Sequence, residues 1–437
     1  MAFESLDELL RCFRDHGATR VVAKQLAEND NSKQQIYLGG SFEVLQLLPQ
    51  ASIKTESLGK RPNFKAALNF RWLRDNATLA PAPHAQLILY PDYPEVRLSG
   101  FLRGSDYSPG EHMRPVPSGE RKHFNSTDGR VLFFGVTPDK KIIAHLAIAK
   151  SAIAKEVATR AKADEFLVEG VLLHIPLGKS KSTKTQLLTK LREIRAAGWH
   201  ISCRMNKHGE IIAYAAQNGG GYTLEALLGI KPNSDAAPDF LGWEIKAYGS
   251  GKVTLMTPEP DVGFYGEKGV KEFVRKYGHD AGDDVLYFTG IHRAGNICEA
   301  SGQTLVLSGY DHQKQKIVDV LGGIHLIDRR GNVSAGWSFE GLIAHWSKKH
   351  AAAAYVPYEK ESGAPPKYQY QSPVLLGEET EFPLYLSALQ NGLIVYDPGS
   401  KVMNASKPNS TVKARSQFRI PVRNLAALYK KFEPADI

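Results

Sequence analysis

A short basic segment, residues 178–184, separates two parts of this sequence that differ in pattern. The segment combines small and basic residues and contains no large apolar one. Short strand-like runs dominate before it, whereas a helical pattern over residues 186–197 opens a mixture of helices and strands after it. The chain has 437 residues, more than one hydrophobic core usually supports. We therefore expect two domains, residues 1–178 and 179–437, of the α+β class.

The first part reads as a small β-rich domain. Helical patterns occur near its start and its end, at residues 3–13 and 149–163. The expected strands are residues 35–38, 84–90, 96–102, 131–136, 141–148 and 166–175. Glycine, proline and aspartate separate these runs, as they do in turns. Short, evenly spaced strands of this kind favour an antiparallel barrel or sandwich.

The overall charge is positive, with 55 lysines and arginines against 46 aspartates and glutamates, a net charge of +9. This favours a polyanionic partner, because basic side chains neutralise phosphates; a basic surface without such a partner is the alternative. Three cysteines, far apart in the sequence, form no C-x-x-C pair, so neither a zinc site nor a redox motif is indicated. The sequence shows no membrane-spanning run and no leader pattern, and we expect a soluble intracellular protein.

The segment from Asp239 to Lys246 carries the residues best suited to chemistry. If residues 243–247 form a strand, Glu244 and Lys246 project on one face while Ile245 packs into the core. Asp239 approaches this strand through a flexible stretch and can bring its carboxylate to the same edge. These two carboxylates and a main-chain carbonyl, that of Ile245, are the hard oxygen ligands that Mg²⁺ prefers. Lys246 would orient a water molecule or help to deprotonate it.

A motif this short also occurs by chance. Its alternative interpretation is an exposed strand that bears a Glu–Lys pair two residues apart. Upstream, a glycine-rich loop at residues 219–221 precedes an expected helix, with Thr223 as its cap. Glu225 would lie in the first turn of this helix and add a third carboxylate to the site. Alternatively, Glu225 faces solvent and complements the helix dipole.

The second part of the chain resembles the MvaI/BcnI restriction endonucleases, distant relatives of the mismatch-repair nickase MutH. The resemblance lies in residues 197–200, in the loop and helix with Glu225, in residues 236–246 and 337–340, in Lys348 and Lys349, and in residues 417–420. It covers most of residues 185–437 in the same order.

This resemblance implies a PD-(D/E)XK nuclease core, a mixed sheet flanked by helices. Asp239, Glu244 and Lys246 would be its catalytic set, with Glu225 as a supporting acidic residue. The resemblance further implies a Mg²⁺-dependent monomer that cuts double-stranded DNA at short, nearly palindromic sites and leaves a 5′-phosphate.

Several basic residues of the second part are candidate DNA contacts. Arg419 matches an arginine of the family, and as a guanine reader it would contact O6 and N7. Lys413 and Arg415, in the same late segment, would contact phosphates. Lys252 follows the catalytic strand and would line the phosphate groove. For each of these residues, a solvated surface position is the alternative.

The first part contains two polar segments that would act as DNA-reading arms. One covers residues 24–35 and offers Asn31, Lys33 and Gln35, and the other offers Glu95 and Arg97, followed by Arg103 and Gly104. Such residues read base edges in a major groove, although plain β-turns have the same composition. Over residues 18–177 these features resemble the N-terminal effector domain of the EcoRII endonuclease, a DNA-binding pseudobarrel.

Together, the two resemblances imply a type II restriction endonuclease with two DNA-binding domains. It would cut a CCNGG-type site, with CCWGG favoured, while the first domain binds a further DNA copy as an effector. A strand-specific nickase like MutH and a catalytically silent DNA-binding protein are the alternatives. We expect the protein in the bacterial or archaeal cytoplasm, with a cognate methyltransferase in the same system but not as a bound subunit.

Overall fold

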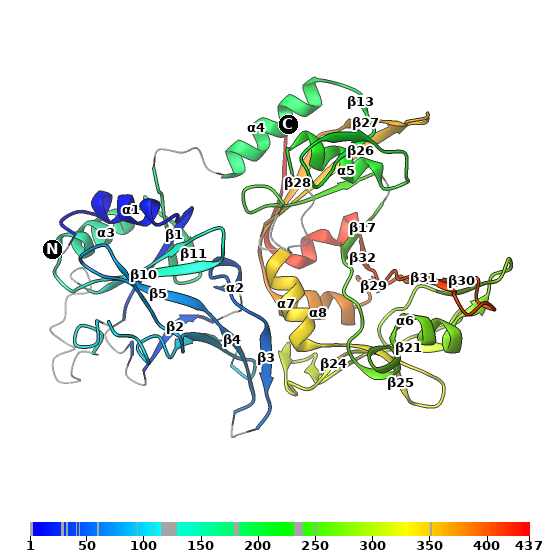
Figure 1. Ribbon diagram of the computed structural model, residues 1–437, viewed down its shortest axis with the longest axis horizontal. Coiled ribbons are helices and arrows are strands. Elements are labelled where there is room, and N and C mark those ends of the chain that lie inside the picture. Colours follow the sequence, from blue (N-terminus) through cyan, green and yellow to red (C-terminus); the bar gives the residue numbers. More distant parts are fainter. Residues whose placement is uncertain are drawn as a thin grey trace. The chain divides into compact units, whose positions relative to one another are not determined.

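The computed structural model describes most of the chain. The described residues are 3–27, 30–31, 34–40, 42, 44–58, 61–93, 95–107, 109–114, 129–178, 183–230, 239–249, 251–349 and 352–437. The chain divides into two compact units, Met1–Ser180 and Lys181–Ile437, hereafter the N-terminal and the C-terminal unit. Both units mix helices with β-sheets (Figure 1), as the α+β class predicts.

A seven-stranded sheet forms one layer of the N-terminal unit, in the order β11-β12-β1-β9-β10-β5-β6. Its neighbouring strands are antiparallel except for the parallel pair of β10 and β5. The strands are β1 (Arg20–Gln25), β5 (Asn69–Leu73), β6 (Leu79–Pro81), β9 (Val131–Val136), β10 (Lys141–Ala147), β11 (Leu167–Glu169) and β12 (Leu172–Ile175).

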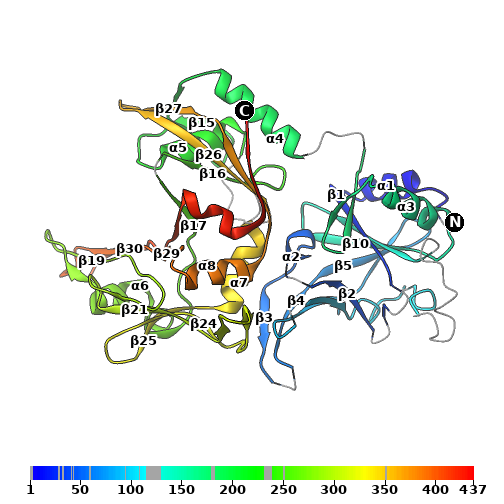
Figure 2. The same cartoon turned by 180° about the vertical axis from the view of Figure 1, so that it is seen from behind.

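Two helices, α1 (Leu6–Asp15) and α3 (Ala152–Lys162), share a hydrophobic core with this sheet. Figure 2 shows the two helices together beside β1 and β10. Ser5 caps α1 by accepting a hydrogen bond from the backbone N–H of Glu8 at 3.2 Å, which fixes where the helix begins. Both helices predicted from the sequence in this part of the chain are thus confirmed, each beginning three residues later than expected.

A second sheet of five strands has the order β2-β8-β7-β4-β3. Its strands are β2 (Gln35–Gly39), β3 (Ile53–Glu56), β4 (Asn63–Ala67), β7 (Gln86–Tyr90) and β8 (Glu95–Ser99), and the short helix α2 (Val44–Leu47) follows β2. Along β8, Val96 and Leu98 are buried, whereas Glu95, Arg97 and Ser99 alternate with them on the other face. This face of the sheet is therefore polar.

Three expectations for the N-terminal unit were wrong. The strand expected over residues 166–175 is two antiparallel strands, β11 and β12, because the chain turns at Gly170, whose φ is +59°. The strand expected over residues 96–102 ends at Ser99, because Gly100 has a φ of +69° and a Cβ there would lie 2.0 Å from the carbonyl oxygen of His84. The polar segment expected over residues 24–35 begins inside β1. Lys24 is only 4% exposed and forms an ion pair with the equally buried Asp30, so its charge is satisfied inside the unit.

The C-terminal unit is built around the sheet β13-β27-β26-β28-β33, with β16 pairing with β26 outside this path. The strands are β13 (His200–Ile201), β16 (Glu244–Tyr248), β26 (Ala352–Glu361), β27 (Lys367–Tyr370), β28 (Val374–Thr380) and β33 (Tyr429–Ala435). Helices α4 (Thr183–Ala196) and α5 (Gly219–Leu227) pack on one face of this sheet through a shared hydrophobic cluster.

The remaining sheets of this unit are smaller. Their strand orders are β14-β15, β17-β32-β29, β18-β19-β30-β31, β20-β21-β24-β25 and β22-β23. The strands are β14 (Cys203–Met205), β15 (Ile211–Ala213), β17 (Lys252–Met256), β18 (His279–Asp280), β19 (Val285–Thr289), β20 (Ile297–Cys298), β21 (Gln303–Ser308), β22 (Tyr310–Asp311), β23 (Lys316–Ile317), β24 (Gly323–Ile327), β25 (Val333–Ser338), β29 (Val395–Tyr396), β30 (Gly399–Met403), β31 (Thr411–Lys413) and β32 (Phe418–Pro421).

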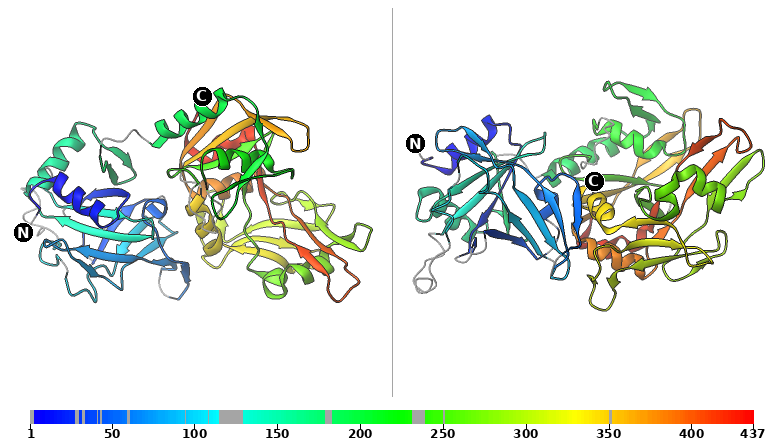
Figure 3. Two further views of the ribbon diagram at one scale, coloured as in Figure 1. Left: turned by 45° about the horizontal axis from the view of Figure 1, so that its top comes forward. Right: turned by 60° about the horizontal axis from the view of Figure 1, so that its bottom comes forward.

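The described part of the C-terminal unit has four further helices: α6 (Gly263–Tyr277), α7 (Phe339–Lys349), α8 (Phe382–Gln390) and the 3₁₀ helix η3 (Val422–Leu428). Figure 3 shows the orange-red strands β30 and β31 beside the yellow-green β19, although more than 100 residues separate β19 from β30. Within the described parts of the chain, no helix combines the length and the apolar character needed to cross a bilayer.

Candidate active site and DNA-binding residues

Strand β16 carries two of the residues singled out from the sequence on one face. It runs parallel to β26, with Glu244 opposite Ala353 and Lys246 opposite Tyr355. Ile245, which is 5% exposed, points to the other face and joins the hydrophobic cluster under α4 and α5. The Nζ of Lys246 donates to Oε1 of Glu244 at 2.8 Å. The strand and the alternation predicted from the sequence are therefore confirmed.

A tight turn returns the chain from Asp239 to this strand. Phe240 and Trp243 exchange both backbone hydrogen bonds, at 2.9 and 2.8 Å. Between them, Leu241 has a φ of +50° and Gly242 a φ of +92°, the two positive angles of a type I′ turn. Oδ2 of Asp239 accepts a hydrogen bond from the backbone N–H of Ile245 at 3.0 Å. The turn thus places the Asp239 carboxylate beside β16, at the residue between Glu244 and Lys246.

The same hydrogen bond shows which edge of the strand the Ile245 carbonyl faces. In a β-strand, the N–H and C=O groups of one residue point to the same side. Because the Ile245 N–H is bonded to Asp239, the Ile245 carbonyl also lies on the Asp239 side of β16. The Asp239 carboxylate and the Ile245 carbonyl therefore lie on one side of β16, and the Glu244 carboxylate projects from the preceding residue of the strand. All three groups are hard oxygen donors.

These donors fit a divalent cation such as Mg²⁺, which binds few protein carboxylates and keeps several water ligands. No group of three or more histidine, cysteine, aspartate or glutamate side chains suited to a metal occurs among the described residues. The donor set expected from the sequence has two carboxylates and so does not require such a group.

Two buried tyrosines lie near Glu244 on the sheet. The hydroxyl groups of Tyr355 and Tyr429 are 2.7 Å apart. Burial raises the pKa of each phenol far above its ordinary value, and the negative charge of Glu244 adds to the increase. Both tyrosines are therefore neutral at physiological pH, and they add no negative charge that would compete for the cation or for Lys246.

Glu225 is placed differently from the sequence expectation. Helix α5 begins at Gly219, so Glu225 lies in its second half and not in its first turn. Thr223 is not the cap, because it lies in the middle of the helix. Its hydroxyl accepts a hydrogen bond from the backbone N–H of Cys203 at 3.1 Å and donates to the carbonyl of Cys203 at 3.2 Å. The negative charge of Glu225 contributes to the raised pKa of Tyr370, after burial as the main cause.

The glycines at the start of α5 explain why the helix begins earlier than the sequence predicted. A Cβ on Gly219 would lie 2.7 Å from the hydroxyl of Tyr368, and one on Gly220 would lie 2.6 Å from the ring of Tyr358. Residues without a side chain are needed for this close packing. The segment that looked like a loop is therefore helical because of tertiary contacts.

Arg419, the candidate guanine reader, lies on β32 opposite Thr254 of β17. Its Nη1 forms an ion pair with Oδ2 of Asp397 at 2.7 Å, and both side chains are 24% exposed. Lys252 is exposed two residues before Thr254 on the same strand, so Lys252 and Arg419 share one face of the sheet. Asp397 was not predicted as a functional residue, because it lies 22 residues before Arg419 and no local pattern indicates their contact.

The other two basic candidates of this unit are also accessible. Lys413 is exposed at the end of β31, and Arg415 is exposed in the segment that leads to β32. The backbone of Arg415 is fixed, because its carbonyl accepts from Gly399 N–H at 2.9 Å and its own N–H donates to Ser400 Oγ at 3.0 Å.

Three candidates of the N-terminal unit lie together on the polar face of the five-stranded sheet. Nη2 of Arg97 pairs with Oε1 of Glu95 at 2.8 Å, and Nη1 donates to Oε1 of Gln35 at 3.2 Å. Asn31 instead uses its side-chain amide to donate to the carbonyl of Met113 at 3.0 Å. Lys33 lies outside the described residues.

The arrangement on β16 defines a candidate site for metal-dependent hydrolysis, carried by a mixed sheet with helices. The sequence profile of the MvaI/BcnI restriction endonuclease family matches residues 188–429, more than half of the chain. The chain belongs to this family, and it is accordingly a type II site-specific deoxyribonuclease that cleaves DNA in a sequence-specific manner.

Two solved structures are similar to this chain. One is described as a restriction endonuclease MvaI–cognate DNA substrate complex; it shows 18% identity, a TM-score of 0.45, and coverage of 59% of this chain and 99% of its own. The other, MvaI in the absence of DNA, shows 16% identity, a TM-score of 0.34 and the same coverage. A comparison with curated protein sequences gives no match.

Proposed function

We propose that Asp239, Glu244 and Lys246 form the catalytic set of this endonuclease and that Mg²⁺ is its cofactor. The observation that carries the proposal is the hydrogen bond from Ile245 N–H to Asp239, which holds the aspartate beside the Glu244–Lys246 pair. The carboxylates of Asp239 and Glu244 and the Ile245 carbonyl would hold the cation. When bound, Mg²⁺ supplies stabilisation of the charge on the phosphate and lowers the pKa of a water molecule.

Within this set, Lys246 has the task of positioning the nucleophile. Its side chain is 16% exposed, and its ammonium group already donates to Glu244, which is buried. A hydrogen-bond donor held in this way orients the attacking water toward the phosphorus and stabilises the hydroxide formed from it. Glu225, on the helix that packs against β16, supports the site as a further acidic group.

We infer that Arg419 reads a guanine of a CCNGG-type site, with CCWGG preferred. The support is the ion pair between Nη1 and Asp397, which orients the guanidinium while the side chain stays 24% exposed. Lys252, Lys413 and Arg415 are exposed and would contact phosphates, which position a protein on DNA without reading its sequence.

For the N-terminal unit, we propose a DNA-binding pseudobarrel over residues 1–178 that holds a further copy of the site as an effector, the nuclease domain being residues 179–437. Gln35, Glu95 and Arg97 support this role, because their hydrogen-bonding groups share one polar sheet face. When this unit binds one copy of the site, the DNA is tethered, and the local concentration of the other copy at the nuclease unit rises.

Incubation of supercoiled plasmid with the full chain tests the proposal. Linear DNA with Mg²⁺ and unchanged plasmid with excess chelator are expected, and sequencing the new ends gives the site. Open-circular product would indicate a nickase, and no cleavage would indicate a silent DNA-binding protein. For the effector role, a plasmid with two sites should be cut faster than one with a single site, and equal rates would contradict it.

A further inference from the structure

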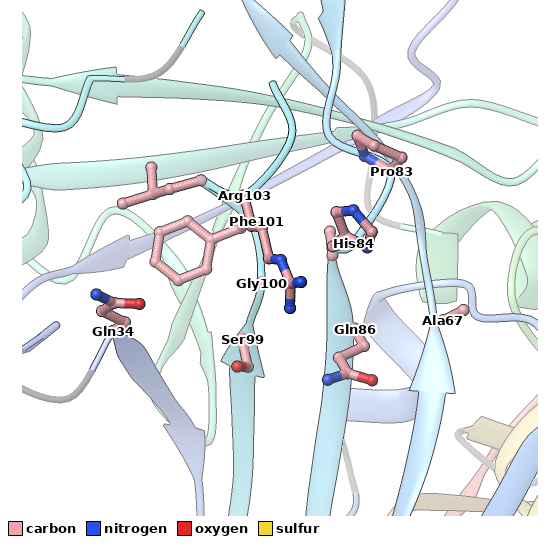
Figure 4. A pocket seen from close by; sticks show the side chains of 11 residues that line it. Gln34, Ala67, Pro83, His84, Gln86, Ser99, Gly100, Phe101 and Arg103 are labelled. Carbon is pink, nitrogen blue, oxygen red and sulfur yellow. The ribbon is translucent and has the colours of Figure 1, made fainter. Parts of the chain in front are cut away.

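A pocket of about 420 Å³ opens at one end of the five-stranded sheet of the N-terminal unit. Figure 4 shows the Arg103 side chain reaching toward Ser99 and Gln86, with Gln34 nearby. These residues come from the end of β8, the start of β7 and the segment before β2. Three sequence segments thus build one pocket.

The wall that carries Arg103 is held in place by a tight turn. Gly100 and Gly104 have φ angles of +69° and +73°, and a Cβ on either would come within 3 Å of His84. The backbone N–H of Arg103 donates to the carbonyl of Gly100 at 3.1 Å. In addition, Trp72 Nε1 donates to the carbonyl of Phe101 at 2.7 Å. The main chain below Arg103 is therefore fixed before any ligand binds.

The charge in the pocket suits an anion. Among the described residues that line it, none is acidic, whereas Arg103 brings a permanent positive charge. Two other arginines of this unit are neutralised, Arg74 by Asp106 at 2.8 Å and Arg97 by Glu95 at 2.8 Å. Within the part of the chain that the structure describes, the exposed Arg103 has no carboxylate partner. Its guanidinium therefore keeps a positive charge that a bound anion can neutralise.

The pocket continues the polar sheet face that carries the candidate base readers. Ser99 of β8 is paired with Gln35 of β2 on one side and with Gln86 of β7 on the other. Ser99 lies two residues beyond Arg97, a distance of about 7 Å along the strand. The pocket therefore lies next to the candidate base readers on the same sheet face, within the reach of one bound duplex.

We propose that this pocket binds a backbone phosphodiester of the DNA held by the N-terminal unit, with Arg103 as the charged ligand and Gln34, Gln86 and Ser99 as hydrogen-bond donors. The inference rests on the proposed DNA-binding function of this unit. It adds a sequence-independent contact beside the residues that would read bases.

The test measures binding of fluorescently labelled duplexes to the full chain in EDTA, at salt concentrations from 50 to 200 mM. The variants are Arg103→Ala, Arg103→Lys, Arg97→Ala and the control Lys155→Ala, which removes an exposed charge from α3. Duplexes with and without the site are used, and a set of site-containing duplexes carries one neutral methylphosphonate each.

Arg103→Ala should weaken binding equally for duplexes with and without the site, and Arg103→Lys should restore most of the loss. Removal of one phosphate contact should make the slope of log K against log salt less steep by about 0.9, so the deficit shrinks about 3.5-fold between 50 and 200 mM. One methylphosphonate position should weaken the wild type but not Arg103→Ala. Lys155→Ala should behave as the wild type.

The inference is overturned if Arg103→Ala binds like Lys155→Ala, or if it loses affinity only for the duplex with the site, which would indicate base reading. A 2-aminopurine placed in the site gives a further check. If its fluorescence rises on binding to the wild type but not on binding to Arg103→Ala, the pocket holds an extruded base and the inference is overturned. If Arg97→Ala binds both duplexes as the wild type does, the proposed function of the unit fails as well. If Arg97→Ala loses affinity for DNA and Arg103→Ala does not, only the proposed phosphate site is rejected.

Discussion

Glu244 and Lys246 form an ion pair that is largely shielded from water, so the two substitutions should not add independently. The charged atoms are 2.8 Å apart, and the side chains are 3% and 16% exposed. Removing one partner of a buried pair typically costs 3–5 kcal/mol, because the other charge stays buried without compensation. We expect Lys246→Met to lower the free energy of unfolding by about 3 kcal/mol.

Removing both charges should cost less than the two single changes combined. Glu244→Gln leaves a lysine that reaches water through its flexible chain, so its cost is about 1 to 2 kcal/mol. The double variant leaves no buried charge and should resemble the milder single variant. The coupling free energy of the pair should therefore be about 3 kcal/mol.

Urea denaturation of the full chain in EDTA, followed by tryptophan fluorescence, measures this coupling. Trp243 is buried next to β16 and reports on this region. The exposed pair of Lys190 and Glu193 on α4, 2.9 Å apart with side chains 44% and 59% exposed, is the matched control. Its coupling should stay below about 0.5 kcal/mol. An equally small coupling between Glu244 and Lys246 would refute the contact.

Three further results follow from the geometry. Leu241→Asn should raise the free energy of unfolding by about 0.5 to 1 kcal/mol, because Leu241 has a φ of +50° and is 48% exposed; a lower urea midpoint would contradict this. Arg419→Ala should reduce kcat/KM on the cognate duplex by about 10- to 100-fold and relax the penalty for replacing one guanine; an unchanged penalty in cleavage assays of substituted duplexes would exclude base reading. Burial lowers the pKa of His292 from 6.5 to about 4, so the folded state favours the neutral ring. Its stabilisation is complete above pH 6.5 and is lost as the pH falls toward 4, by up to about 3 kcal/mol. His292→Gln should flatten this pH dependence of the unfolding free energy, and an unchanged dependence would contradict the assignment.

Local hydrophobic patterns were sufficient to predict strands whose burial follows from a continuous apolar run or from alternation of apolar and polar residues. The apolar run at residues 131–136 is the strand β9, buried at every position, and the alternation over β16 predicted that Ile245 is internal. Asp239 could be placed near this strand because only a two-residue turn separates the paired residues Phe240 and Trp243. For these elements, sequence neighbours determine the structure.

Contacts between distant segments could not be predicted in this way. The glycine-rich start of α5 is helical because Tyr358 and Tyr368 pack against it, and these tyrosines lie more than 130 residues away. Likewise, the partner of Arg419 is Asp397, 22 residues earlier in the chain. Such pairings depend on how the sheets assemble, which a single sequence pattern does not encode.

Asp239→Ala provides the most direct test that the groups at β16 hold a cation against the phosphodiester. Single-turnover cleavage with saturating Mg²⁺ and duplex binding in EDTA are measured on the same preparations, with Glu267→Ala on α6, an exposed carboxylate, as control. The variant should lose cleavage by about 10³-fold or more. Its affinity for the duplex in EDTA should stay within about threefold of the wild type, because the cation acts mainly in the transition state. Substantial cleavage by Asp239→Ala, with Glu267→Ala unchanged, would show that the active site lies elsewhere in the chain.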